Sequence, residues 1–143
     1  MREPVLVVGS DLRQLMDIAV AFRGAAYGPT FALCPEVIER ASAGTDAPSR
    51  PVVVCFNGRE TAGQIAEFLA CDPLAVLIEP AAGLNAPVRR IVEAFGQVTF
   101  EYGVPGLVVL AALIAVARDR SLRAEQEPGN SAAIPFRDNA GSD

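Results

Sequence analysis

Five short apolar runs alternate with five segments of helical periodicity, and this alternation limits the possible folds more than any other feature. The apolar runs are EPVLVVGS (3–10), PTFALCP (29–35), PVVVCFN (51–57), LAVLIEP (74–80) and QVTFEYG (97–103). Several of them are apolar at successive positions, as strands are when helices cover both faces of a sheet. We therefore expect an α/β fold: a doubly wound five-stranded parallel sheet of flavodoxin-like order 2-1-3-4-5 in three α/β/α layers.

The segments between the runs carry the signals of helices. Residues 85–96 place Val88, Ile91, Val92 and Phe95 on one stripe at the spacing i, i+3, i+4, i+7. The other expected helices are 11–24, 35–44, 60–72 and 105–126. Right-handed crossovers bring the carboxyl ends of parallel strands to one edge of the sheet, so we expect any site there.

His and Lys are both absent, and each absence excludes a kind of chemistry within the chain. There is no His, and all 12 basic residues are Arg, so no Lys is present. Schiff-base formation, a Walker lysine, a Ser-His-Asp triad and histidine ligation of a metal are excluded. We expect no catalytic activity, no cofactor and no resident metal.

Charge and hydropathy bear on partners and location. The net charge of −5 argues against binding nucleic acid or an acidic membrane, since both need a basic surface. The apolar fraction of 51% favours a surface that a protein partner buries. The three separated cysteines are typical of a reducing compartment, and the longest apolar run (104–117) is too short to span a bilayer. We expect a cytoplasmic protein.

The stretch VLVVGSDLRQLM (5–16) resembles the opening of the receiver domain of response regulators, where a strand runs into acidic residues and a helix. The resemblance covers about residues 3–124 and implies a CheY-like fold. It also implies a pocket that holds Mg²⁺ and accepts a phosphoryl group on an aspartate after the third strand. The positions that match this pocket are Ser10, Asp11, Asn57, Glu79 and Glu101.

The matching positions lack the groups that this chemistry needs. Asn57 stands at the phospho-acceptor (Phe56 if the alignment shifts by one), and an amide is not nucleophilic enough to take a phosphoryl group. Only Asp11 remains of the acidic pair that holds Mg²⁺. Glu79 replaces the switch Ser or Thr, and no lysine follows the fifth strand. We interpret the chain as a degenerate pseudo-receiver, which is not phosphorylated and acts in signalling or assembly by binding protein.

Other functions remain open at the same edge. A small-ligand-binding or enzymatic subunit could use the crevice at the ends of strands 1 and 3. Cys34 and Arg40 have the C-x5-R spacing of thiol phosphatases, although the residues between them are too bulky to cradle phosphate. Asp11, Glu79 and Glu101 could gather around a divalent metal. Arg89 and Arg90 could bind a phosphate or an acidic partner.

The last expected helix is apolar all the way round in LVVLAALIAVA (107–117), so its outer face should also be buried. We expect a homodimer or another protein partner at the face made by helix 4, strand 5 and helix 5. The interface residues that we predict are Leu107, Val109, Leu110, Leu113, Ile114 and Val116.

A change in composition suggests two parts, a receiver-like domain at 1–124 and a flexible tail at 125–143. The tail contains IPFRD (134–138), a candidate docking motif. GNSAAIPFRD (129–138) faintly resembles the C-terminal end of the small subunit of diol dehydratase-reactivating factors.

Overall fold

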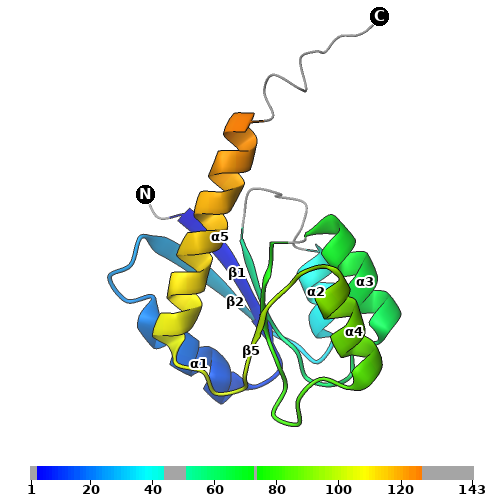
Figure 1. The fold of residues 1–143 in the computed structure, drawn as a ribbon. Coiled ribbons are helices and arrows are strands. Elements are labelled where there is room, and N and C mark those ends of the chain that lie inside the picture. The colour runs from blue at the N-terminus through cyan, green and yellow to red at the C-terminus, as the bar shows by residue number, and fades with distance from the viewer. Residues whose placement is uncertain (1–2, 44–50, 73, 127–143) are drawn as a thin grey trace, which may run out of the picture.

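The computed structural model describes residues 3–43, 51–72 and 74–126 of the 143-residue chain. Strands and helices alternate strictly along these residues, as the sequence pattern predicts (Figure 1). The strands are β1 (Glu3–Gly9), β2 (Tyr27–Leu33), β3 (Val52–Cys55), β4 (Val76–Ile78) and β5 (Thr99–Phe100). The helices are α1 (Leu12–Ala21), α2 (Val37–Ala43), α3 (Ala62–Cys71), α4 (Ala86–Ala94) and α5 (Gly106–Gln126).

The strands form one parallel sheet of order β2-β1-β3-β4-β5, which confirms the predicted topology. The longest pairing joins β1 to β2, where seven residue pairs run from Glu3–Tyr27 to Gly9–Leu33. Because all the strand pairings are parallel, all five carboxyl ends lie at one edge of the sheet. We call this edge the carboxyl edge.

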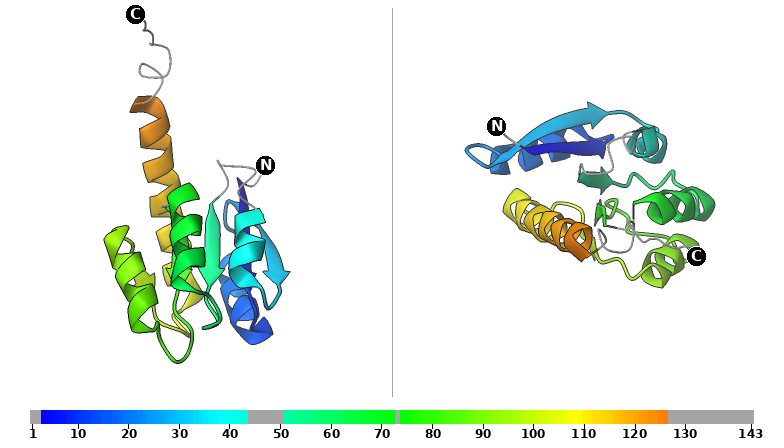
Figure 2. Two further views of the ribbon diagram at one scale, coloured as in Figure 1. Left: turned by 90° about the vertical axis from the view of Figure 1, so that its right-hand side faces the viewer. Right: turned by 90° about the horizontal axis from the view of Figure 1, so that it is seen from above.

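Helices cover both faces of the sheet, as continuous apolar strands require. α1 and α5 lie on one face, and α2, α3 and α4 lie on the other (Figure 2, right). Side chains alternate along β1, so Val5 and Val7 pack under α1 and α5, whereas Leu6 and Val8 pack under the other three helices. The fold therefore has two apolar cores separated by the sheet.

The observed strands are shorter than the apolar runs, most of all at β5. The prediction gave β5 the range 97–103, but only Thr99 and Phe100 pair with a neighbour. β4, with which β5 pairs, is itself only three residues long (Val76–Ile78), so it offers few positions for a longer ladder. α5 ends at Gln126, as expected for the helix at 105–126, so the domain boundary placed at 124 falls inside this helix. The remainder of the expected tail, including IPFRD, lies outside the described residues.

α1 and α5 approach each other closely at Gly106, the first residue of α5. A β-carbon built at Gly106 would lie 2.9 Å from the backbone oxygen of Asp17 and 3.0 Å from the β-carbon of Ala21. Glycine is needed here because the backbone of α1 occupies the space that any side chain would take. This contact sets where α5 starts on the sheet.

Candidate functional site

Asp11 follows β1 and has both carboxylate oxygens engaged within the chain. As the N-cap of α1, it accepts a hydrogen bond from the backbone N–H of Arg13 at 3.0 Å. Its other oxygen accepts a hydrogen bond from the hydroxyl of Tyr102, which follows β5. This hydrogen bond lowers the pKa of Asp11 and raises the pKa of Tyr102. Tyr102 thus connects the segment after β5 to the end of β1, across β3 and β4, a role that the sequence pattern did not reveal.

Asn57 lies in the loop after β3 and ties this loop to its neighbour. Its amide nitrogen donates to the backbone oxygen of Pro35, between β2 and α2, at 2.9 Å. Its amide oxygen accepts from the backbone N–H of Arg59 at 3.0 Å, a local turn that asparagine favours. Phe56, the alternative position for a phospho-acceptor, is buried. The side chain of Asn57 therefore holds two loops together.

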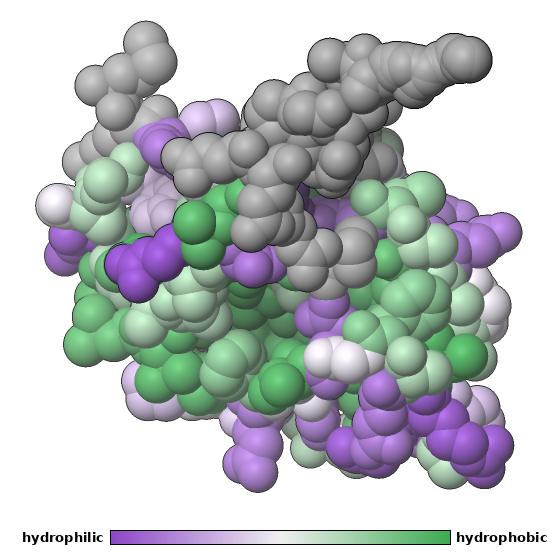
Figure 3. Space-filling view, turned by 45° about the horizontal axis from the view of Figure 1, so that its top comes forward, coloured by the Kyte–Doolittle hydropathy of each residue, from purple (hydrophilic) through white to green (hydrophobic). Residues whose placement is uncertain are grey.

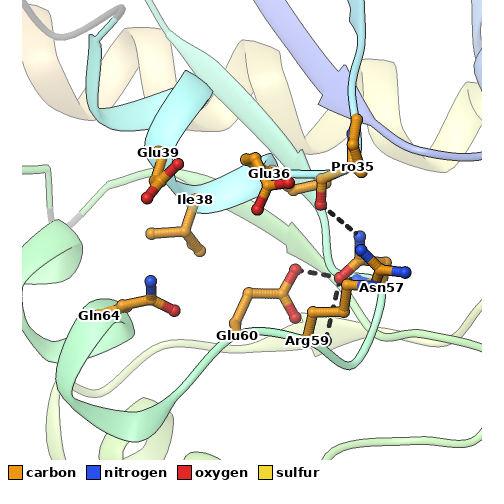
Figure 4. Close-up of a pocket in the computed structure, with 9 residues that line it drawn as sticks. Pro35, Glu36, Ile38, Glu39, Asn57, Arg59, Glu60 and Gln64 are labelled. Carbon is orange, nitrogen blue, oxygen red and sulfur yellow. Dashed lines mark hydrogen bonds between the residues drawn. The ribbon is translucent and has the colours of Figure 1, made fainter.

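Glu60 is a third polar residue at this edge, and sequence reasoning missed it. Its two carboxylate oxygens accept one hydrogen bond each from the backbone N–H groups of Asn57 and Gly58, both at 3.0 Å. Figure 4 shows the first of these two hydrogen bonds. The residue is only 9% exposed. The spacing of residues in the sequence does not predict this contact, because it depends on the conformation of the loop before α3.

Glu79 follows β4 and is bound to groups beside it. It accepts a hydrogen bond from the hydroxyl of Thr99 at 2.5 Å and forms an ion pair with Arg89 of α4 at 3.5 Å. Ser10 and Glu101 are exposed. Asp11, Asn57 and Glu79 thus each contact different groups of the chain. Within the described ranges, no group of three or more His, Cys, Asp or Glu residues is placed to hold a metal ion.

Three hollows open near these residues. A groove of about 510 Å³ lies between the loop after β3 and the loop after β4, and its wall includes Asn57, Gly58 and Glu60 opposite Leu84 and Val88. A hollow of about 50 Å³ lies on the other side of the same loop, between the starts of α2 and α3 (Figure 4). A third of about 120 Å³ lies between Tyr102 and α1. The groove adjoins the ends of β3 and β4, whereas the crevice that we predicted adjoins the ends of β1 and β3.

The cysteines give no sign of an activated thiol. The thiol of Cys34 donates to the backbone oxygen of Glu36 at 3.4 Å. Burial raises the pKa of Cys55 to about 12, so this thiol stays protonated. Cys71 is exposed.

α5 buries one face in the core and leaves another accessible, which corrects part of the predicted interface. Val109 and Leu113 are fully buried against the sheet, so neither is available to a partner. The sequence could not separate the two faces, since the helix is apolar all round in this region. Leu110 and Val116 are half-buried at the border of the same core.

The accessible face of α5 still carries apolar side chains. Leu107 is 71% exposed and Ile114 is 45% exposed. Phe95, at the end of α4, and Val98, just before β5, are also exposed. Figure 3, in which the top of Figure 1 is turned toward the viewer, shows apolar surface (green) next to hydrophilic residues (purple).

A second contact holds α5 farther along its length. Arg120 forms an ion pair with Asp72, the residue after α3, and both side chains are largely buried. Burial raises the pKa of Asp72 although the arginine opposes the shift.

Within the described residues, no helix combines the length and the apolar character that a bilayer span needs.

Comparisons with known proteins support the fold. No protein-family model matches the chain, and no curated protein matches it. Among solved structures, it is similar to a response regulator CheY-like protein from Mesorhizobium loti. The two are 19% identical with a TM-score of 0.59 over 81% of this chain and 99% of the other. The chain therefore has a receiver-like, flavodoxin-like fold.

Proposed function

We propose that this chain is a non-catalytic, receiver-like interaction module that is not phosphorylated and acts in signalling or assembly. The observation that carries the proposal is the state of Asn57. It stands where a receiver-like fold would present its phospho-acceptor, and both ends of its amide are hydrogen-bonded to backbone groups. An amide so held offers no nucleophilic oxygen.

The surroundings of Asn57 support the same reading. Mg²⁺ is held at sites of this kind by carboxylate oxygens. Here the carboxylates of Asp11, Glu60 and Glu79 each accept hydrogen bonds from other groups of the chain. A metal or phosphoryl group would have to displace these contacts, and no lysine is present to balance added negative charge.

The proposed binding surface is the side formed by α4, β5 and α5. The exposed apolar residues of these elements and of the segment before β5 include Phe95, Val98, Leu107, Val108 and Ile114. Burying an exposed leucine or isoleucine side chain contributes about 1–2 kcal/mol when half to three quarters of it leaves water, before the cost of association. The partner is a second copy of the chain or another protein.

Phosphorylation is tested by incubating the protein with acetyl phosphate and Mg²⁺ and measuring its intact mass, with beryllofluoride titration followed by NMR. We expect no added phosphoryl group and no shift of the amide signals around Asn57. The Asn57→Asp variant restores the acceptor oxygen without the metal site, so we expect it to remain unmodified as well. A phosphorylated wild-type protein would refute the proposal.

The surface is tested by a pair of charge substitutions. Ile114→Asp, on the proposed side, should abolish concentration-dependent association in sedimentation experiments. Val20→Asp, at a residue of α1 that is 58% exposed, is the matched control and should leave association unchanged. A wild-type protein that stays monomeric over the full concentration range removes the homodimer and leaves only a heterologous partner.

The groove of about 510 Å³ favours a second candidate function, a small-ligand-binding or enzymatic subunit. Its volume suits a small organic ligand, and its wall combines apolar side chains with Asn57 and Asn85. A thermal-shift screen of nucleotides and sugar phosphates tests this function. A ligand that stabilises the wild type but not Ala82→Trp, which fills the groove, would favour it over the interaction module.

A further inference from the structure

The loop after β3 holds a carboxylate in the manner in which proteins hold external anions. The backbone N–H groups of Asn57 and Gly58 are successive donors, and each is 3.0 Å from a different oxygen of Glu60. Gly58 has a φ of +90°, a backbone conformation that turns neighbouring N–H groups toward one point. Two such N–H groups form a concave anion site, or nest.

Glu60 fills this nest and is nine-tenths buried while doing so. Burying a charged carboxylate is unfavourable unless hydrogen bonds replace its water. The two N–H groups supply that replacement. Glu60 lines the hollow of about 50 Å³ together with Glu36 and Glu39, which lie near the start of α2 (Figure 4). Arg59, the residue before Glu60, lines this hollow too. The carboxylate is therefore held here by the backbone of its own loop.

We propose that Glu60 is a tethered occupant of an oxyanion nest, which fixes the loop after β3 and keeps external carboxylates and phosphates out of it. The ligand class of the emptied nest is a small oxyanion with two oxygens that can face the N–H groups of Asn57 and Gly58. The proposal rests on this geometry alone. It holds whether or not the chain is phosphorylated and whichever side binds a partner.

Glu60 also lies in the wall that separates the groove from the small hollow. Asn57 and Glu60 line both the groove of about 510 Å³ and the hollow of about 50 Å³. Gly58 is exposed on the groove side, so an external anion reaches the nest from the groove once the carboxylate is removed. Glu60 is thus a positioning residue for the groove wall as well as the occupant of the nest.

The test is chemical rescue of Glu60→Ala, with Glu67→Ala as the matched control, since Glu67 is an exposed glutamate of α3. Amide hydrogen exchange of Asn57 and Gly58 is followed by NMR. Hydrogen bonds to a charged group contribute about 1.5–3 kcal/mol, so we expect exchange of both amides to accelerate about tenfold to a hundredfold in Glu60→Ala. Glu67→Ala should exchange as the wild type does.

Formate and inorganic phosphate are then titrated separately into each protein, against chloride at the same ionic strength. We expect formate to slow exchange at Asn57 and Gly58 in Glu60→Ala with saturation, and to leave the wild type and Glu67→Ala unchanged. Rescue by phosphate as well extends the nest to tetrahedral oxyanions. Unchanged exchange in Glu60→Ala, or no saturable response to either anion, overturns the proposal.

A second variant keeps the test decisive if Glu60→Ala does not fold. Glu60→Gln has the same shape but one acceptor oxygen, so only one of the two N–H groups keeps its partner. We expect one amide of the pair to exchange faster and the other to stay protected. Equal protection of both amides in Glu60→Gln would refute the bidentate contact on which the proposal depends.

Discussion

Replacing Gly106 by alanine should destabilise the protein, although alanine is the better helix former. The new β-carbon would lie 2.9 Å from the backbone oxygen of Asp17 and 3.0 Å from the β-carbon of Ala21. Neither atom is the end of a flexible side chain, so α1 and α5 must move apart. Overpacking of this kind costs about 1–3 kcal/mol, and better helix propensity recovers at most about 1 kcal/mol. We expect a net loss of about 1–2 kcal/mol.

Gly63 provides the matched control because it also lies in the first turn of a helix, α3. A β-carbon there meets no atom within 4 Å, so Gly63→Ala gains helix propensity without a clash. We expect this variant to be about 0.5–1 kcal/mol more stable than the wild type. The two variants should differ by about 2 kcal/mol, or roughly 6 to 8 °C in Tm for a chain of this size.

The assay is urea unfolding with linear extrapolation, in which both variants should keep the wild-type m value. A Gly106→Ala protein as stable as Gly63→Ala would mean that α1 and α5 do not touch at this point. The position of α5, and with it the proposed binding surface, would then need another explanation.

Three further predictions concern titrating groups. Tyr102→Phe should raise the pKa of Asp11 toward its ordinary value, because the hydrogen bond that lowers it is lost, and an NMR titration that gives the wild-type pKa would contradict this. In the wild type, the hydrogen bond adds stability above the unfolded-state pKa of Asp11, and this stability is lost as pH falls through the lowered folded-state pKa. The Tyr102→Phe variant should lack this added stability. Iodoacetamide at mildly alkaline pH should label Cys71 and spare Cys55 in the native protein, as peptide mass mapping would show, because burial raises the pKa of Cys55 to about 12. The raised pKa of Asp72 favours the folded state below the ordinary value of 3.8, and this stability is lost as pH rises through the folded-state pKa. As pH rises from below 3.8 through the folded-state pKa of Asp72, the free energy of unfolding should therefore fall less in Asp72→Asn than in the wild type. Urea unfolding at several pH values measures this, and the same pH dependence in both proteins would contradict the prediction.

The strand order and the alternation of elements could be predicted because they depend on runs of residues. Continuous apolar runs such as Val5–Val8 and Val52–Cys55 require cover on both faces, and that requirement leaves few topologies. The helix expected at 11–24 begins as predicted, and Asp11 caps it. The start of α3 depends on Thr61, which exchanges hydrogen bonds with Gln64, a contact that the sequence analysis did not identify.

The buried face of α5 and the contacts at the carboxyl edge could not be predicted, for different physical reasons. A helix that is apolar all round has no periodicity that distinguishes Val109 in the core from Ile114 at the surface. The bond between Tyr102 and Asp11 joins residues 91 positions apart, and only the folded sheet brings them together. Glu60 binds backbone N–H groups, which every sequence possesses, so its partner leaves no trace in the residue pattern.

α5 is mounted on the domain at two points, and this fixes the direction in which it leaves. Gly106 seats its first turn on α1, and Arg120 ties it to Asp72 about 21 Å farther along the axis at 1.5 Å per residue. A helix that is held at two such separated points cannot rotate about either of them. A molecule that binds α5 is therefore held in a fixed orientation relative to the sheet. Loss of either contact would allow α5 to rotate about the other.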